Sequence, residues 1–234
     1  MFFVNIILLV GSPNAGKGTI AQLLMDFFQG LFAYIATGNV FRHYIRRKRK
    51  IGLAAKSHMD VPELVPDSLT LKIFGYRLRW MDVKNALQII FDGFPRTIEQ
   101  AKALLEAFPG ATFTVLFINV SEEEVVSRST KRFICKTCSS PYSTDLHPGV
   151  IAQGVCTQRK GKSACGGLLY KRIEDTEEGA RKRYEEFVRI TMPVLLWLYN
   201  HRIKILEICG DQCPDVVFAD VCAALNLQPE QVLT

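Results

Sequence analysis

The sequence has no apolar run as long as the 18 or more residues that a transmembrane helix requires, although 48% of its 234 residues are apolar. The apolar opening Met1–Val10 lacks the basic residues and the A-x-A cleavage site of a signal peptide, so we expect a buried first strand there. Internal repeats and low-complexity tracts are absent as well. The composition therefore predicts one sizeable core that could carry small insertions, and no membrane partner.

The excess of charge is modest. The formal net charge is +6 and the sequence pI is about 8.9, which suits anionic partners from nucleotides to nucleic acids without choosing among them. The basic run Arg46-Arg47-Lys48-Arg49-Lys50 has no interleaved aromatic residues on which bases could stack. We interpret the run as a solvated helix face and expect no nucleic-acid partner.

Cysteine is clustered. Seven cysteines are present, an odd number, and nothing in the sequence indicates export. Four of them fall within 31 residues, which in a reducing compartment indicates metal ligation rather than disulfides, so we expect a cytoplasmic protein. These four are Cys135, Cys138, Cys156 and Cys165. The other three, Cys209, Cys213 and Cys222, are expected to be small buried hydrophobic residues.

Strand-like and helix-like patterns alternate along the chain. Short apolar runs predict strands at Phe3–Val10, Leu31–Ile35, Ala86–Phe91, Thr112–Val120 and Arg202–Ile208. The helical spacing of apolar residues predicts helices at Thr19–Phe28, Ile98–Phe108 and Glu177–Tyr199. This alternation indicates an α/β fold with a mostly parallel sheet and helices on both faces.

Two segments depart from the alternation. Residues 37–66 are helical and basic, and residues 131–172 hold the clustered cysteines among Gly, Ser, Thr and Pro. We interpret both as insertions into one core, which then consists of residues 1–36, 67–130 and 173–234.

A glycine-rich loop follows the first predicted strand and opens the first predicted helix. Its residues are Gly11, Ser12, Pro13, Asn14, Ala15, Gly16, Lys17, Gly18 and Thr19. The pattern G-x4-G-K is typical of phosphate-binding loops, because backbone N–H groups and the positive helix end face the anion and the lysine reaches the outer phosphates. Gly18 stands where Ser or Thr is usual.

Two other interpretations fit part of this loop. A glycine-rich turn with a surface lysine would need no ligand, but the strand–loop–helix context argues against it. The spacing Gly16-x-Gly18-x-x-Ala21 also matches a dinucleotide fingerprint, which requires an acidic residue at the end of the second strand. Residues 33–40 contain none, so the phosphate loop is favoured.

Three further blocks follow the loop in order. They are Thr37-Gly38-Asn39-Val40-Phe41-Arg42, Leu64-Val65-Pro66-Asp67, and Asp92-Gly93-Phe94-Pro95-Arg96-Thr97 with Gln100. Together with the loop, the blocks resemble the adenylate kinase family across nearly the whole chain. The resemblance implies a P-loop core with a five-stranded parallel sheet, a helical insertion that binds the nucleoside monophosphate (residues 37–66) and a lid (residues 131–172).

The resemblance also implies roles on the AMP side. Arg42 and Arg96 are forked cations suited to the α-phosphate of AMP, and the Gln100 amide can both donate to and accept from the adenine edge. Asp92, at the carboxyl end of a strand, would hold Mg²⁺ directly or through water. The AMP-binding set is Thr37, Arg42, Val65, Gly93, Arg96, Gln100, Arg172 and Arg183.

Further arginines flank the lid segment. By resemblance, Arg132, Arg172 and Arg183 hold the transferring phosphoryl group, and Lys17, Arg96 and Asp92 complete the catalytic set. Arg128 would help to hold ATP, with an ordinary helix-surface charge as the alternative. Glu174 and Asp175 are expected to orient the arginines rather than to act as bases. The ATP-binding set is Gly11, Pro13, Asn14, Ala15, Gly16, Lys17, Gly18, Thr19, Arg128, Arg132 and Gln212.

The cysteine pattern is C-x2-C, then C-x8-C. Four thiolates suit tetrahedral Zn²⁺, and Cys165-Gly166-Gly167-Leu168-Leu169-Tyr170 resembles the closing part of the zinc-bearing lid of some bacterial adenylate kinases. The second spacer is longer than in that lid, but loop closure costs only about (3/2)RT ln n. A vestigial site and a redox pair are the alternatives, and a redox pair normally lies at a helix start. His147 is interpreted as a turn residue, because four thiolates suffice.

The predicted reaction is Mg²⁺-dependent ATP + AMP ⇌ 2 ADP, by direct in-line transfer inside a closed lid. The expected partners are ATP and AMP, and the expected state is a monomer with structural Zn²⁺ in its lid. One alternative is a kinase of the same family with another donor or acceptor, such as GTP. The other is an inactive nucleotide- or nucleic-acid-binding relative, against which the retained arginines argue. The chain departs from the family pattern at Asn14, where glycine is usual, and at Ala36, Asn39, Phe133 and Gln212.

Overall fold

Five parallel strands form the central sheet. The computed structural model describes residues 5–59, 64–79, 88–160 and 163–228. The strands are β1 Asn5–Val10, β2 Phe32–Ala36, β3 Gln88–Asp92, β4 Thr112–Asn119 and β10 Lys204–Cys209, in the order β10-β4-β1-β3-β2. The predicted α/β class and five-stranded parallel sheet are confirmed. The predicted strand residues Phe3, Val4, Ala86 and Leu87 lie outside the described residues.

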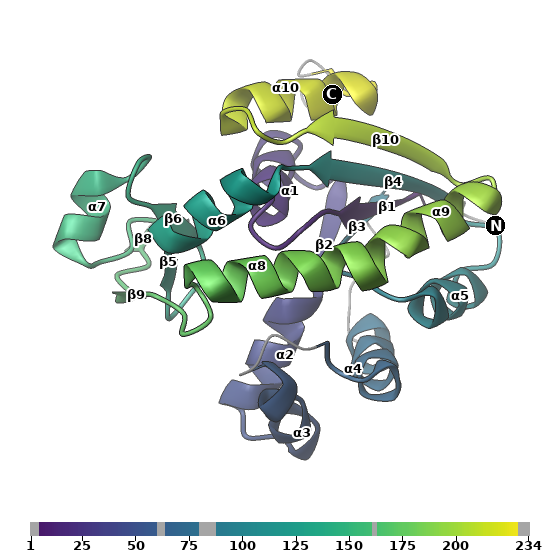
Figure 1. Cartoon of the computed structure of the whole chain (residues 1–234), viewed down its shortest axis with the longest axis horizontal. Coiled ribbons are helices and arrows are strands. Elements are labelled where there is room, and N and C mark those ends of the chain that lie inside the picture. Colours follow the sequence, from purple (N-terminus) through teal and green to yellow (C-terminus); the bar gives the residue numbers. More distant parts are fainter. Residues whose placement is uncertain (1–4, 60–63, 80–87, 161–162, 229–234) are drawn as a thin grey trace.

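Helices cover both faces of the sheet (Figure 1). One face packs against α5 Ile98–Ala107 and α9 Met192–Asn200, and the other against α1 Lys17–Phe27, α6 Glu122–Lys131 and α10 Pro214–Ala224. Side chains alternate across a strand, so Leu8 joins the first core while Ile7 and Leu9 join the second. This two-sided burial explains why β1 is an unbroken apolar run.

The order of the strands places the functional loops. β1 lies between β3 and β4, where the sheet order changes direction, and ligands of open α/β sheets bind at the carboxyl edge of such a point. Leu9 near the end of β1 pairs in register with Asp92 at the end of β3. The loop after β1 and the Asp92 carboxylate therefore meet at one edge.

The long helix predicted at Glu177–Tyr199 is interrupted. It consists of α8 Glu177–Glu186, a π-helical segment η1 Phe187–Thr191 and α9 Met192–Asn200, which follow one another as a single rod in Figure 1. Pro193 lies at the start of α9 and has no N–H to donate to the preceding turn. The wider π turn accommodates that missing donor.

Three helices form a separate small core beside the sheet. They are α2 Thr37–Arg46, α3 Lys50–Met59 and α4 Asp67–Arg79. The buried apolar residues of this core are Phe41, Ala55 and Ile73 from the helices and Val65 from the segment before α4. The helical prediction for residues 37–66 is confirmed at 37–46 and 50–59, whereas residues 47–49 form a turn and residues 64–66 are not helical. Residues 60–63 lie outside the described residues, and α4 was not predicted.

Two other helices were missed although their ends carry recognisable signals. α6 begins with Glu122, Glu123 and Glu124 and ends with Arg128 and Lys131, which is the charge order that a helix dipole favours. Pro214 opens α10 at a position where proline is common.

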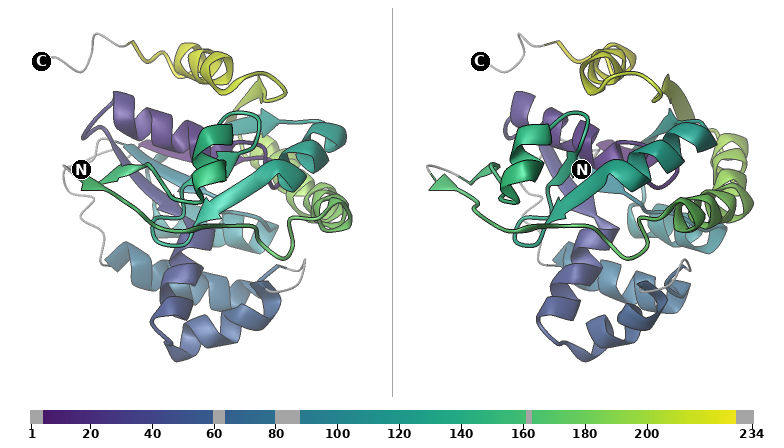
Figure 2. Two further views of the ribbon diagram at one scale, coloured as in Figure 1. Left: turned by 90° about the vertical axis from the view of Figure 1, so that its left-hand side faces the viewer. Right: turned by 60° about the vertical axis from the view of Figure 1, so that its left-hand side comes forward.

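The cysteine-rich segment contains short antiparallel strands. β6 Pro141–Ser143, β5 Arg132–Cys135 and β9 Leu169–Tyr170 form a three-stranded sheet, and β7 Arg159–Lys160 pairs with β8 Ser163–Ala164. One short helix, α7 Pro148–Gln153, packs beside β6. This segment lies at one end of the molecule, away from α3 and α5 (Figures 1 and 2).

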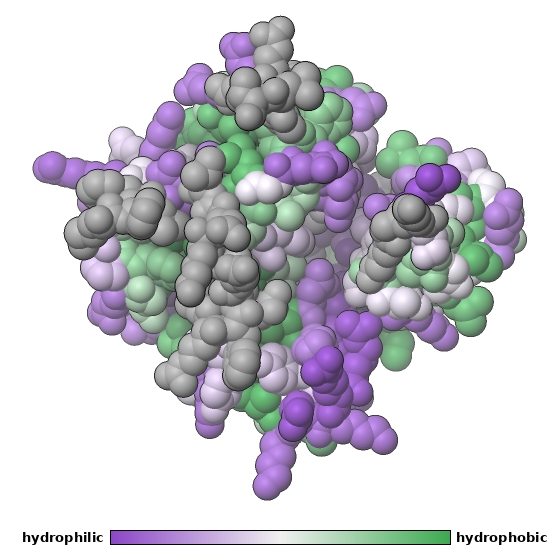
Figure 3. Space-filling view, turned by 180° about the vertical axis from the view of Figure 1, so that it is seen from behind, coloured by the Kyte–Doolittle hydropathy of each residue, from purple (hydrophilic) through white to green (hydrophobic). Residues whose placement is uncertain are grey.

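Two surface expectations need correction. Cys209 and Cys213 are exposed and Cys222 is half-buried, so the prediction of burial is wrong for the first two. Cys209 ends an edge strand and Cys213 begins a helix, where the chain turns at the surface. The basic run is exposed as predicted, but it spans the turn between α2 and α3 instead of one helix face, and hydrophilic side chains gather over this region in Figure 3.

No helix in the described ranges has both the length and the apolar character needed to cross a bilayer.

Candidate functional site

The loop after β1 has a backbone that glycine makes possible. Gly16 adopts a left-handed φ of +88° just before α1, and a Cβ on Gly11 would lie 2.6 Å from the carbonyl oxygen of Ile118. Asn14 has φ +65°, which agrees with the expectation that asparagine tolerates the left-handed region here. The loop thus lets the backbone N–H groups approach a ligand at the start of α1.

Cationic side chains line one pocket at this edge of the sheet. Five of them are Lys17, Arg42, Arg96, Arg172 and Arg183. Burial lowers the pKa of Lys17 to about 8, an effect that Asp92 opposes and the positive charges of Arg96 and Arg132 reinforce. Burial likewise lowers the pKa of Arg42 to about 10, with repulsion from Arg172 adding to it. Anions would relieve this repulsion, so the pocket is suited to phosphates.

Buried polar atoms without a hydrogen-bond partner gather around the same pocket. Within the described ranges these atoms are Ser12 Oγ, Asn14 Oδ1, Asn14 Nδ2, Thr37 Oγ1, Arg42 Nε and Arg172 Nε. Each unsatisfied buried group costs about 1–3 kcal/mol. The pocket is therefore shaped for a polar ligand that would complete these hydrogen bonds.

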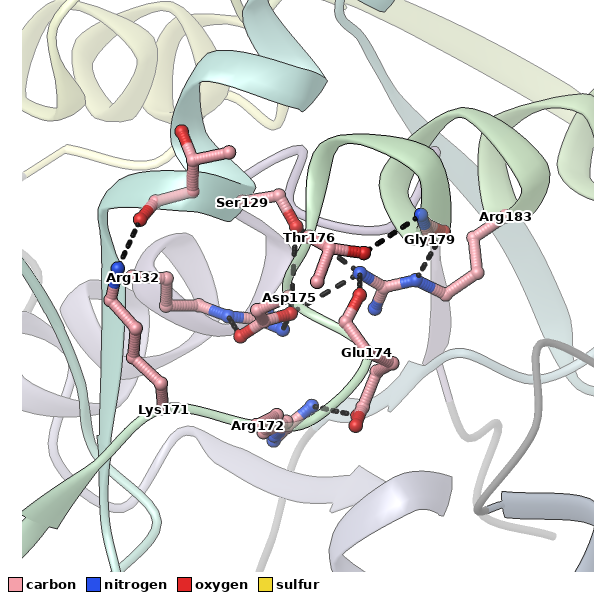
Figure 4. A network of polar contacts seen from close by, with 10 residues as sticks. Ser129, Arg132, Lys171, Arg172, Glu174, Asp175, Thr176, Gly179 and Arg183 are labelled. Carbon is pink, nitrogen blue, oxygen red and sulfur yellow. Dashed lines mark hydrogen bonds and ion pairs between the residues drawn. The ribbon is translucent and has the colours of Figure 1, made fainter.

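Asp175 connects two arginines behind the pocket (Figure 4). Its carboxylate is fully buried and accepts two hydrogen bonds from Arg132, at 2.6 and 2.9 Å. Arg183 Nη2 donates to Asp175 Oδ1 at 3.2 Å, and Arg172 pairs with Glu174 at 3.9 Å. Both acids face guanidinium groups, which is the geometry expected of residues that orient arginines.

Arg128 lies beside the phosphate-loop candidate. A Cβ on Gly16 would be 3.8 Å from Arg128 Nη1, and Arg128 Nη2 donates to Gly210 O at 2.6 Å. The backbone oxygen of Gln212 is 3.5 Å from Arg128 Nη2, whereas the Gln212 side-chain amide donates to Asp220 at 3.3 Å. Arg128 Nε also donates to Glu124 Oε1 at 2.7 Å, as an ordinary helix-surface charge would. The contacts of Arg128 are compatible with both interpretations, a part of the ATP site and a helix-surface charge.

Gln100 lines the pocket with its amide partly engaged. Gln100 Oε1 accepts from the Arg96 backbone N–H at 2.8 Å, and Gln100 Nε2 donates to Asp67 Oδ1 at 2.7 Å. An amide oxygen has two lone pairs and an amide nitrogen two protons. With respect to the described residues, one acceptor and one donor position of the amide are left for a ligand.

Asp92 has one occupied and one available oxygen. Tyr34 donates its hydroxyl to Asp92 Oδ2 at 2.7 Å, and burial together with Asp92 raises the pKa of Tyr34. Asp92 Oδ1 receives no hydrogen bond from the part of the chain that the structure describes. A free carboxylate oxygen beside the phosphate loop fits the preference of Mg²⁺ for oxygen ligands.

The four clustered cysteines converge. Their sulfur atoms all lie within 4.8 Å of one another, with Cys135 Sγ 3.7 Å from Cys165 Sγ and Cys138 Sγ 3.5 Å from Cys156 Sγ. Four sulfurs bound tetrahedrally at about 2.3 Å from Zn²⁺ would be about 3.8 Å apart. The cluster is therefore compatible with a zinc site. His147 is outside it and begins α7, as expected of a turn residue.

The longer spacer does not separate the second pair of cysteines. Within the spacer, β7 Arg159–Lys160 pairs antiparallel with β8 Ser163–Ala164, and Cys165 N donates to Gln158 O at 2.8 Å. Because this pairing brings Cys165 back beside Gln158, Cys156 and Cys165 reach the same cluster.

Comparison with known proteins agrees with this geometry. A family model described as adenylate kinase matches residues 9–203. An adenylate kinase of Lactobacillus delbrueckii subsp. bulgaricus is 37% identical over 227 residues, which cover 95% of this chain and 99% of the relative. The chain belongs to the adenylate kinase family. Adenylate kinases of Alkaliphilus oremlandii and Methanocella arvoryzae are 34% and 36% identical, over 94% and 93% of this chain and 98% and 97% of their own lengths.

Three residues at the site of this adenylate kinase family member were not singled out from the sequence. Tyr34 and Asp67 hold other site residues by hydrogen bonds, and Glu186 lines the pocket and accepts from Leu64 N at 3.1 Å. Asp67 ends a motif block, which is a signal that could have identified it. Tyr34 lies in an ordinary strand pattern that carries no such signal.

The depressed pKa of Lys17 predicts a pH-dependent stability. Between pH 8 and 10.5 the unfolded chain binds a proton that the folded chain has lost, so the free energy of unfolding should rise with pH. We expect Lys17 to contribute about 1–2 kcal/mol to the rise between pH 8 and 10. Urea unfolding of the ligand-free protein at both pH values, in a buffer without phosphate, measures it.

In Lys17→Met, the free energy of unfolding should lack the part of its rise between pH 8 and 10 that Lys17 contributes. Lys102→Met, which removes an exposed lysine on α5, should keep it. An equal pH response in the wild type and in Lys17→Met would show that Lys17 is not perturbed.

Proposed function

We propose that this protein catalyses the reversible transfer of the terminal phosphoryl group of ATP to AMP, giving two ADP. The observation that carries the proposal is the pocket in which Lys17 and four arginines face one another in partial burial. Phosphoryl transfer between two nucleotides depends on positioning and charge neutralisation, which such a pocket supplies. Membership of the adenylate kinase family supports the same reaction.

On the ATP side, Lys17 neutralises the outer phosphates. In the ligand-free protein its Nζ donates to Gly11 O at 2.9 Å and to Ser12 O at 2.7 Å, so the lysine is folded back on its own loop. Phosphate oxygens are stronger acceptors than these carbonyls and replace them. Arg128, held beside the loop by Gly210 O, adds a second cation. Gly11, Pro13, Asn14, Ala15, Gly16, Gly18, Thr19 and Gln212 complete the proposed ATP site.

On the AMP side, Arg42 and Arg96 bind the α-phosphate. Arg42 is fixed by a hydrogen bond of 2.7 Å to Asn39 Oδ1, and Arg96 by one of 3.2 Å to Gly93 O. Gln100 uses its remaining donor and acceptor on the adenine edge. Thr37 and Val65 complete the wall of the pocket.

Arg132, Arg172 and Arg183 bind the group in transfer. Asp175 and Glu174 hold them in place before the substrates arrive, so little reorganisation is needed when charge spreads over the transferring oxygens. A single arginine in this role is worth about 10³–10⁵ in rate.

Asp92 holds Mg²⁺ through its available oxygen, directly or through water. When bound, the ion neutralises charge on the phosphates between which the group moves. Tyr34 keeps the Asp92 carboxylate in place by donating to its other oxygen.

Cys135, Cys138, Cys156 and Cys165 bind one structural Zn²⁺ in a lid made of residues 131–172. The sulfur spacing supports it, as do the backbone N–H groups of Thr137 and Cys138, which lie 3.4 and 3.5 Å from Cys135 Sγ and stabilise a thiolate. Cysteines that bind a metal must stay reduced and not form disulfides. A reducing compartment maintains this state, which supports a cytoplasmic protein. Both nucleotide sites are built from one chain, which supports a monomer.

Within the proposed function, the first prediction concerns the enzymatic activity. With Mg²⁺, the purified protein should convert ATP and AMP to ADP, and UMP and CMP should be much poorer acceptors, because Gln100 and Thr37 are placed for adenine. A coupled assay with a panel of monophosphates and of donors, including GTP, measures this. ADP formation no faster than with Lys17→Met, or faster use of UMP, would contradict the proposal.

The second prediction separates the arginines by kinetic effect. Arg42→Ala should mainly raise the KM for AMP, whereas Arg132→Ala and Arg172→Ala should lower kcat by about 10³ or more. Arg181→Ala is the matched control, since Arg181 is exposed on α8 and pairs with Glu122 and Glu177. Equal losses of kcat at an unchanged KM in all three site variants would refute the assignment.

The third prediction concerns the lid. Elemental analysis should find about one Zn per chain, and Cys165→Ser should lose the metal and lower the melting temperature, because the thiolates hold together a segment with a small core. Cys213→Ser, an exposed cysteine outside the cluster, should change neither. Full zinc content and an unchanged melting temperature in Cys165→Ser would exclude this ligand. Some phosphoryl transfer should persist at low temperature, because the arginines lie outside the cluster.

A further inference from the structure

Asp67 and Gln100 form a hydrogen-bonded pair across two helices. Asp67 is the first residue of α4, and Gln100 lies in the first turn of α5, where its side chain is buried to 2% exposure. The bond between Gln100 Nε2 and Asp67 Oδ1 is 2.7 Å long. The two residues are 33 positions apart in the sequence, so the contact is made by the fold.

The partners of Gln100 allow one orientation of its amide. Its oxygen faces a donor, the Arg96 N–H, and its nitrogen faces an acceptor, the Asp67 carboxylate. A flipped amide would put oxygen against the Asp67 carboxylate and N–H against the Arg96 N–H. Both contacts would be repulsive.

Thr97 restricts the rotation of the Asp67 carboxylate. The Thr97 hydroxyl accepts from Gln100 N at 3.2 Å and donates to Asp67 Oδ2 at 2.8 Å. A hydroxyl has one proton, and this one goes to the carboxylate. Both Asp67 oxygens are thus engaged, one by Thr97 and one by Gln100, and the carboxylate cannot turn away.

Because its amide is fixed, Gln100 presents one hydrogen-bond donor and one acceptor to the base in a fixed arrangement. Gln100 keeps one free N–H and one free oxygen lone pair, a pair that matches adenine, whose amino group is a donor beside a ring-nitrogen acceptor. A 6-oxo purine carries a carbonyl acceptor in place of that amino group, so its edge matches the flipped amide.

We propose that Asp67 is a positioning residue which fixes the Gln100 amide and thereby makes the monophosphate site prefer 6-amino over 6-oxo purines. The proposal rests on the proposed function, in which Gln100 faces the base of the acceptor nucleotide. It adds a residue that acts on base selection without touching the nucleotide.

The test is the ratio of the dissociation constants of IMP and AMP, measured by titration calorimetry without a phosphoryl donor. Asp67→Asn keeps the shape, but the amide that replaces the carboxylate can accept from or donate to Gln100. Of the two contacts that oppose the flipped orientation of Gln100, only the one with the Arg96 N–H then remains. We expect the preference for AMP over IMP to fall roughly tenfold, the size of one weakened charge-assisted hydrogen bond. Asp67→Ser, with a residue that helix starts accept well, should shift the ratio in the same direction.

Glu99→Gln is the matched control. It removes an exposed carboxylate from the residue next to Gln100, where Glu99 pairs with Lys102 at 2.8 Å, and it should leave the ratio unchanged. Thermal unfolding of each variant shows whether it is folded.

An unchanged ratio in folded Asp67→Asn and Asp67→Ser would overturn the inference. This includes the case in which AMP and IMP both bind more weakly by the same factor, because a purely structural role of Asp67 would not discriminate between the bases. Wild-type protein that binds AMP tightly and selectively but transfers no phosphoryl group would refute the proposed function and leave this inference standing.

Discussion

The burial of several cations at one edge of the sheet is the constraint on which the rest of the structure depends. Lys17, Arg42 and Arg96 are all held where burial and neighbouring positive charges oppose their ionisation. Carboxylates oppose these shifts only in part: Asp92 raises the pKa of Lys17 and of Arg96, and Glu174 raises that of Arg42. The ligand-free protein therefore carries an electrostatic cost at its site, which phosphate groups would remove on binding. Such a trade of stability for function is common at sites that act on charged substrates.

The small segments beside the sheet supply much of this charge, and each must be held in place by few contacts. In the cysteine-rich segment, one buried cluster consists of Cys135, Tyr142 and Cys156, and Ile134 is buried beside it in the sequence. Two of the three cluster members are candidate metal ligands, so sulfur atoms make up much of this small core. Tyr142 reinforces them, because its hydroxyl lies 3.0 Å from Cys156 Sγ. The order of this segment thus depends on the four thiolates far more than the order of the sheet does.

The sequence predicted the parts whose chemistry needs a fixed spacing. A phosphate loop needs its glycines and lysine in order, and β1 needs to be apolar on both faces, so both were found. Contacts between distant segments leave no such pattern: the Tyr34–Asp92 and Asp67–Gln100 bonds join residues 58 and 33 positions apart. The interruption of the long helix was readable from Pro193, but helical periodicity alone predicts a continuous helix. The hairpin between Cys156 and Cys165 is set by local pairing, which the spacer length does not reveal.

The Tyr34–Asp92 and Asp67–Gln100 hydrogen bonds have the same effect on the site. Asp92 has one carboxylate oxygen occupied by Tyr34 and one that receives no hydrogen bond from the described residues. In Gln100 both amide atoms are occupied by neighbours, but the oxygen keeps one lone pair and the nitrogen one proton toward a ligand. A side chain that is free on all sides would lose rotamer entropy on binding, and one with every polar atom engaged could not bind at all. Partial engagement fixes the direction of the free atom at the cost of one hydrogen bond made within the protein. In the proposed function, Asp67 and Tyr34 would act on the substrates in this indirect way, Asp67 through the Gln100 amide and Tyr34 through the Asp92 carboxylate.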